Sequence, residues 1–182
     1  MAENSKQQGK TAADGLRIRE ASREDSEQLA GILREAAELM VQSGVEQWKP
    51  EMFTAETVEE YFHTRRVFVL EKDGYAAGLF TLQNSDPSYW GERNDERYLY
   101  LHRLTVRPEF RGLDYGDRML RYAEREADEQ GMKGLRLDCV AHLPKLNAYY
   151  VRQGFVFAAE RDLNRGVGGR YVNLYEKKRA DN

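Results

Sequence analysis

Residues 104–120, LTVRPEFRGLDYGDRML, constrain the possible fold of this chain more than any other segment. The run begins as a β-rich apolar stretch, breaks at Pro108, turns through Gly112 and Gly116, and continues with apolar residues at helical spacing. A helix that starts directly after such a turn leaves several backbone N–H groups without intrahelical partners. These N–H groups and the helix dipole attract anions, so the segment predicts a phosphate-binding strand, turn and helix.

The composition indicates a single globular domain with a small-molecule partner. The chain has 182 residues, of which 41% are hydrophobic and 32% charged, and this length suits one domain with its own core. Its net charge of -3 argues against broad, sequence-independent binding of nucleic acid, which needs a strongly basic surface. We therefore expect no nucleic-acid partner.

The sequence shows no sign of export or of a membrane span. It contains no run of about twenty apolar residues, and its first fifteen residues are polar, so we expect a cytoplasmic protein with no membrane partner. The single cysteine, Cys139, lies in an apolar segment, where packing is favoured over a nucleophilic role. We expect residues 1–14 to be a disordered leader, 15–178 the domain, and 179–182 a tail.

Hydrophobic periodicity predicts the element order β-α-α-β-β-β-α-β-α-β-β, an α/β fold, or α+β by a looser naming. Asp73-Gly74 between two β-rich runs predicts a hairpin, and residues 83–95 form an excursion outside the sheet. The strand-helix-strand unit over residues 97–140 is expected to be parallel and right-handed. Helices are expected to end near Gly44, Arg66, Gly131 and Gly154.

Three local features in this order resemble the GNAT superfamily of acetyl-CoA-dependent N-acetyltransferases, over about residues 16–177. Residues 106–116, VRPEFRGLDYG, look like its acyl-CoA signature, in which Arg or Gln precedes x-x-Gly-x-Gly or Ala; Arg111 and Gly116 match. Residues 147–155, NAYYVRQGF, resemble a later motif in which Tyr stands four residues before Gly-Phe, the position of Tyr150. Residues 101–106, LHRLTV, look like the strand that lies along the pantetheine arm in the family. The likeness implies a mixed, mostly antiparallel sheet of about seven strands, flanked by about four helices.

One position departs from the family pattern, because Asp114 stands where the family usually has the middle glycine. Glycine at this point permits a positive φ and a close approach of the backbone to pyrophosphate. Aspartate tolerates the left-handed conformation at some cost, and its carboxylate repels phosphate if it points inward. We expect the side chain to point outward, near the helix start or beside Arg111 or Arg118.

The resemblance implies acetyl-CoA as co-substrate and no metal. Backbone N–H groups of residues 112–116, with Arg111, are expected to bind the pyrophosphate, and the main chain of residues 104–106 to hold the pantetheine. Asn147 either bonds to the pantetheine or caps its helix, and the sequence does not separate the two. The expected cofactor contacts are Leu104, Thr105, Val106, Arg111, Gly112, Leu113, Asp114, Tyr115, Gly116, Asp117, Asn147 and Tyr150.

Direct acetyl transfer to an amine needs a base and an acid. An amine with a pKa of about 10.4 is mostly protonated at neutral pH, a cost of roughly 4–5 kcal/mol that a base or a desolvating pocket must offset. His102 is the preferred base, since some family members carry a catalytic Glu at this place on the strand, and Asp138 is the reserve. Tyr150, whose motif position in the family faces the sulfur, is the expected acid for the CoA thiolate.

The resemblance predicts an N-acetyltransferase for a primary amine of a small molecule or peptide. Trp48, Tyr89 and Trp90 are expected to line the acceptor pocket. A homodimer is compatible with the family and with exposed final strands. Two alternatives remain: a non-catalytic acyl-CoA-binding module, and a binding domain for another phosphate ligand that shares only the turn.

Overall fold

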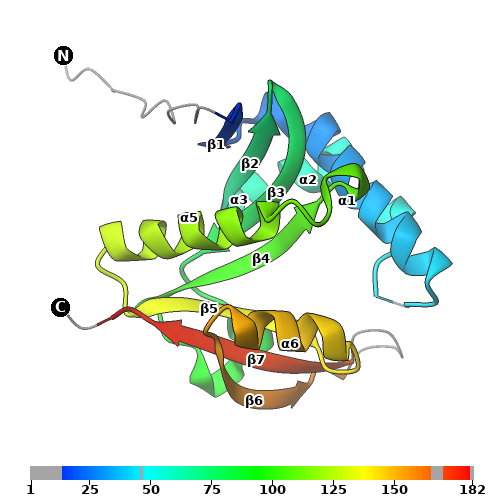
Figure 1. The fold of residues 1–182 in the computed structure, drawn as a ribbon. Helices are drawn as coiled ribbons and strands as arrows, with labels where there is room; N and C mark the ends of the chain where they lie inside the picture. Colours follow the sequence, from blue (N-terminus) through cyan, green and yellow to red (C-terminus); the bar gives the residue numbers. More distant parts are fainter. Residues whose placement is uncertain (1–13, 46, 165–169, 181–182) are drawn as a thin grey trace.

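The computed structural model describes residues 14–45, 47–164 and 170–180, in which a seven-stranded sheet carries helices on both faces (Figure 1). The expected leader, apart from Asp14, lies outside the described residues, as do the last two residues of the tail. The strands are β1 (Leu16–Glu20), β2 (Arg66–Lys72), β3 (Tyr75–Gln83), β4 (Tyr98–Val106), β5 (Gly134–Val140), β6 (Val156–Asp162) and β7 (Tyr171–Lys178). Their order is β1-β2-β3-β4-β5-β7-β6; β4 and β5 run parallel, and the other neighbours antiparallel.

The helices follow the expected order, with two differences. The helix expected to end near Arg66 is two short helices that meet at Glu60, and the excursion at residues 83–95 contains a short helix of its own. Among the described residues no helix is both long and apolar enough to cross a membrane. The helices are α1 (Ser26–Gln42), α2 (Ala55–Glu59), α3 (Tyr61–Thr64), α4 (Pro87–Trp90), α5 (Tyr115–Glu129) and α6 (Pro144–Arg152).

Helices α1 and α5 cover opposite faces of the sheet. Phe68 of β2 belongs to the core cluster under α5, whereas its neighbours Val67 and Val69 belong to the cluster under α1. Successive side chains of a strand point to opposite faces, so the two clusters lie on either side of the sheet. The buried stripe of α5, with the helical spacing expected from the sequence, consists of Met119, Leu120, Ala123 and Ala127.

Strand β4 contains a bulge at Arg103, whose φ of 57° is left-handed. Leu79 of β3 pairs with Thr105 and Thr81 pairs with His102, so β4 fits one extra residue into this interval. The bulge brings consecutive side chains to one face: Arg103 packs among residues under α1 and α2, and His102 beside the end of α4. Without the bulge these neighbours would point to opposite sides.

Strands β4 and β5 separate after four paired residues. Their parallel register runs from Tyr98 opposite Gly134 to Leu101 opposite Leu137, and beyond this point the two strands diverge (Figure 1). Residues 102–106 stay paired with β3 but have no described partner on β5. The centre of the sheet therefore opens along one edge of β4.

Asn147 ties the end of β5 to α6 and β7. Its buried amide nitrogen donates to the carbonyl oxygens of Val140 (3.0 Å) and Leu143 (2.8 Å). Its oxygen accepts from Asn173 Nδ2 and Tyr175 Oη, each at 2.8 Å. Because four protein groups occupy this amide, Asn147 fixes α6 against the diverging strands and has no capacity left for a strong contact with pantetheine.

A charged network fastens β1 to the start of α1. Arg19 donates to both carboxylate oxygens of Asp25 at 2.8 Å, and its Nε donates to Glu71 at 2.8 Å. Asp25 is buried and also accepts from the Ser22 backbone N–H, which closes the turn before the helix. The Arg19 guanidinium lowers the pKa of Asp25 to about 2.

We expect Asp25→Asn to lower the free energy of unfolding by about 1 kcal/mol at pH 7, a value reduced for solvent screening. Because the folded pKa lies below the ordinary value of about 3.9, the carboxylate stabilises the fold above about pH 4, and this contribution is lost as the pH falls toward 2. Urea unfolding of both proteins at several pH values measures the difference. A gap that stays constant down to pH 2 would contradict this assignment.

Candidate active site

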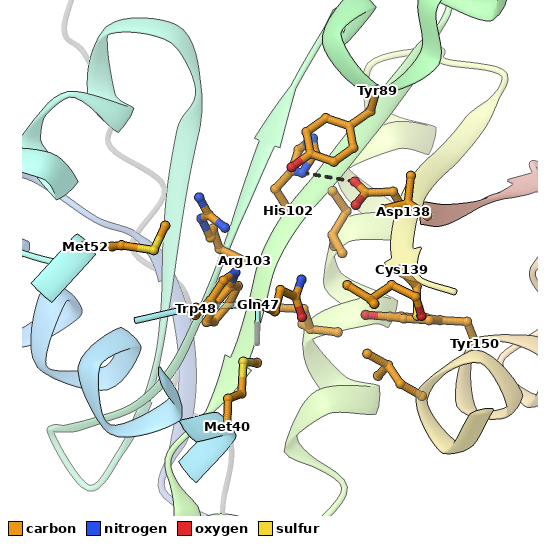
Figure 2. A pocket seen from close by; sticks show the side chains of 15 residues that line it. Met40, Gln47, Trp48, Met52, Tyr89, His102, Arg103, Asp138, Cys139 and Tyr150 are labelled. Carbon is orange, nitrogen blue, oxygen red and sulfur yellow. Dashed lines mark hydrogen bonds and ion pairs between the residues drawn. The ribbon is translucent and has the colours of Figure 1, made fainter. Parts of the chain in front are cut away.

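A cavity of about 200 Å³ occupies the opening between β4 and β5 (Figure 2). Its walls come from the loop after α1, the end of α4, both diverging strands and α6. Six residues expected in the site from the sequence meet here, namely Trp48, Tyr89, His102, Leu104, Asp138 and Tyr150, and Arg103 is among the lining residues that were not expected.

His102 lies between two carboxylates at the top of this cavity. Its Nε2 is 2.9 Å from Asp86 Oδ2, and its Nδ1 is 3.4 Å from Asp138 Oδ1. The strand register explains the second contact: Tyr100 is opposite Arg136, so the next side chains on the same face are His102 and Asp138. The two candidate bases thus form one unit with Asp86.

The hydrogen bond to Asp86 defines the chemistry of the imidazole. Only 4% of the Asp86 side chain is exposed, and a buried carboxylate requires a donor, which is the Nε2–H of His102. In the neutral tautomer this leaves the Nδ1 lone pair toward Asp138 and the cavity.

The same three side chains also fit a cation. One nitrogen and two carboxylate oxygens, from His102, Asp86 and Asp138, lie within 4.8 Å of one another, a donor set that divalent ions accept. Asp86 was missed at the level of sequence, where Asp86-Pro87 indicates only the start of a helix. The expected absence of a metal stays a prediction.

Tyr150 of α6 reaches the cavity beside Cys139 (Figure 2). Its ring is 6% exposed and is held by Tyr149, Phe155 and Tyr175, while its hydroxyl has no hydrogen bond from the described residues. Burial, and then nearby Cys139, raise the pKa of Tyr150 well above its ordinary value. The phenol is therefore protonated at neutral pH and able to donate.

Cys139 lines the cavity but is not activated. It is a buried free cysteine, and burial, followed by the charge of Asp138, raises the pKa of its thiol to about 12. A neutral thiol is a poor nucleophile at neutral pH.

The expected anion-binding turn has the backbone that such a turn requires. Gly112 has a φ of 78°, and Asp114 has a φ of 58° and a ψ of 19°, so the aspartate adopts the left-handed conformation for which the family uses glycine. The first helical hydrogen bond runs from the Arg118 N–H to the Asp114 carbonyl, which leaves the preceding N–H groups at the helix start. The Asp114 residue is exposed. Arg118 forms its ion pair with Asp14, at 2.6 Å.

Gly116 is needed because α6 approaches α5 closely at this point. A Cβ atom on Gly116 would lie 3.0 Å from the Tyr149 hydroxyl. That hydroxyl donates to Asp117 Oδ1 at 2.8 Å, which links the two helices beside the turn. The contact orients Tyr149 away from the cavity and holds the helix that carries Tyr150.

The main chain of β4 faces the opening at alternate residues. The Arg107 N–H donates to the Ala77 carbonyl of β3 at 2.8 Å, so the polar groups of Thr105 also point to β3. By the same alternation, those of Leu104 and Val106 point toward the gap between β4 and β5. An extended ligand can pair with this free edge as an added strand does.

Trp90 does not line the acceptor side, so this expectation is wrong. The side chain is 1% exposed and packs with Tyr98 and Tyr100, with the Arg136 guanidinium 4.3 Å from its ring centroid. Neighbouring residues of a short helix point in different directions, so Tyr89 faces His102, with ring centroids 5.3 Å apart, while Trp90 enters the core.

Comparisons with known proteins agree with this geometry. The sequence profile of the acetyltransferase (GNAT) family matches residues 32–155. The chain is 32% identical over 178 residues to the uncharacterized N-acetyltransferase YesJ of Bacillus subtilis, covering 94% of both chains. A GNAT acetyltransferase structure from Listeria monocytogenes superposes with a TM-score of 0.73 at 25% identity, covering 90% of this chain and 94% of the other.

The fold also matches a solved structure that contains coenzyme A. RimL, a ribosomal alpha-N-protein acetyltransferase in complex with coenzyme A, superposes with a TM-score of 0.65 at 15% identity, covering 93% of this chain and 96% of that one. The family profile spans more than half of the chain, and the similarity to YesJ spans nearly all of it. The chain therefore belongs to the GNAT family and is an acetyltransferase.

Proposed function

We propose that this acetyltransferase moves an acetyl group directly from acetyl-CoA to a primary amine of a small molecule or peptide. The observation that carries the proposal is the cavity between β4 and β5, which a histidine-carboxylate unit and a protonated tyrosine both line. Both proton-transfer groups of the reaction are thus present in one small space.

Acetyl-CoA is expected to bind along the opening in the sheet. The helix start at residues 112–116 and the nearby guanidinium of Arg111 offer N–H groups and positive charge to the pyrophosphate. The free main-chain edge at Leu104 and Val106 offers hydrogen bonds to the pantetheine amides. The coenzyme A complex of RimL, which has the same fold, supports this use of the fold.

The proton transfers follow from the positions of the side chains. His102 Nδ1 accepts the proton of the incoming ammonium, and Asp86 and Asp138 stabilise the resulting charge. The new C–N bond forms as the C–S bond of the thioester breaks. Tyr150 gives its phenolic proton to the departing sulfur, the resulting phenolate takes the second proton from the acetylated nitrogen, and His102 releases its proton to solvent.

A second candidate is a non-catalytic acyl-CoA-binding module, for which the charge of Asp114 beside the docking turn is the motivating observation. Thiol release from acetyl-CoA with a panel of amines, measured beside calorimetric binding of coenzyme A, separates the two. Binding without turnover on any amine would favour the module.

We expect Tyr150→Phe to lower kcat by about 100-fold with little change in KM for acetyl-CoA, because the ring remains but the proton donor is lost. Tyr122→Phe, a half-buried tyrosine packed on Phe68 of the sheet, is the matched control. Steady-state thiol release measures both. Unchanged turnover in Tyr150→Phe would refute the acid assignment.

We expect His102→Gln to lower kcat/KM for the amine by about 100-fold, and Asp86→Asn by about 10-fold, because Asp86 acts through the imidazole. The exposed His63 supplies the control variant His63→Gln. If Asp138→Asn costs more activity than His102→Gln, then Asp138 rather than His102 is the base.

Asp114 permits a separate test of charge and backbone. Asp114→Asn removes the negative charge but tolerates the left-handed φ, and we expect it to lower the Kd for coenzyme A severalfold by removing repulsion. Asp114→Gly should do the same and also raise Tm by a few degrees, because glycine adopts this φ without strain. Calorimetry and thermal unfolding give the two values. Weaker binding in both variants would show that the carboxylate helps to dock the cofactor.

A further inference from the structure

One arginine, Arg103, lines the acceptor side of the cavity, a second, Arg65, lies near it, and neither has a carboxylate hydrogen-bond partner in the described part of the chain. Arg103 lines the cavity at the bulge of β4, and Arg65 follows α3. Arg103 Nε donates only to the Tyr61 hydroxyl, at 3.2 Å, and the Nε of Arg65 is buried without a partner.

Arg65 and Arg103 are half-buried, and the two buried arginines of the described chain differ from them. Arg107 pairs with Glu35, and Arg136 pairs with Glu176 at 3.0 Å. Half-buried guanidinium groups without a carboxylate hydrogen-bond partner keep N–H donors for an anionic ligand.

The two guanidinium groups are close enough to affect each other. Burial, and then the charge of Arg103, lower the pKa of Arg65, while Tyr61, Asp86 and Tyr89 act in the opposite direction. Arginine remains charged under these conditions. The acceptor side therefore carries two positive charges, and the Asp86 carboxylate, which is no hydrogen-bond partner of either arginine, offsets part of the charge of Arg65.

Aromatic rings hold Arg103 without neutralising it. Its guanidinium carbon lies 5.1 Å from the ring centroid of Trp48, 5.6 Å from that of Phe53 and 5.7 Å from that of Tyr61. Such contacts orient the planar group and leave N–H donors for a ligand. Figure 2 shows Arg103 and Trp48 across the cavity from Asp138 and Tyr150.

We propose that the acceptor is an amino carboxylate of amino-acid size, a conclusion that rests on the proposed acetyl transfer. The cavity is electrostatically divided: the Asp138 carboxylate attracts the ammonium end, and Arg103, with the charge of Arg65 near it, attracts the carboxylate, whose planar shape matches a guanidinium. The Asp86 and Asp138 carboxylates beside His102 repel the acidic group of the ligand, so the zwitterion enters with its ammonium group toward His102. The volume of about 200 Å³ suits a small molecule.

The test compares amino acids with their carboxamides as acceptors in the thiol-release assay, so that the pair differs only in the anionic group. We expect the ratio of kcat/KM for acid over carboxamide to fall by about 10- to 100-fold in Arg103→Gln and in Arg65→Gln, mainly through KM. Arg125→Gln is the matched control, since Arg125 also lies over a tyrosine ring, at 5.4 Å, but outside the cavity. Comparing this ratio between each variant and the unmodified protein cancels the difference in intrinsic reactivity between an amino acid and its carboxamide.

Amino acid binding to the coenzyme A complex, measured by calorimetry, provides a second readout. If the enzyme acetylates both members of each pair and neither arginine variant changes the ratio of kcat/KM for acid over carboxamide, the amino-carboxylate inference is overturned. The proposed acetyl transfer is unaffected by that result. A protein that binds amino acids through these arginines but releases no thiol with any amine refutes the proposed function and supports the binding site. If Arg103→Gln does not fold, Arg65→Gln alone decides the outcome.

Discussion

The site depends on the early end of pairing between β4 and β5. Parallel strands normally continue their ladder, but here it stops at Leu101 and Leu137, and the sheet opens while its outer pairs remain intact. The opening exposes a main-chain edge and creates the cavity. The bulge at Arg103 adds a second consequence, because it turns two consecutive side chains, a base and a cation, toward the same face.

Several interactions outside the cavity keep its two walls in place. The saturated amide of Asn147 joins β5, α6 and β7, and the Tyr149–Asp117 hydrogen bond joins α6 to α5. Both act on the helix that carries Tyr150. Tyr150 and His102 are therefore held in fixed positions in the cavity without direct contact with each other.

The site was predictable where its residues are close together in the sequence. The strand, turn and helix of residues 104–120 and the Tyr150 motif each lie within a short segment, so spacing alone indicates their geometry. Asp86 is 16 residues from His102, in a loop whose path no periodicity describes. Trp90 was placed wrongly for a related reason, since residue type in a loop does not tell which side chain enters the core.

The sequence by itself determined the order of the main elements and the positions of the glycine-bearing turn, of Tyr150 and of the two candidate bases, because periodicity and local motifs depend on neighbours along the chain. The tertiary structure alone decided that both bases form one unit with Asp86, that Asn147 is structural, and that Arg65 and Arg103 meet without a carboxylate. Each of these rests on distances between strands and loops far apart in sequence. Such distances follow from the sheet register and the bulge, which no local pattern records.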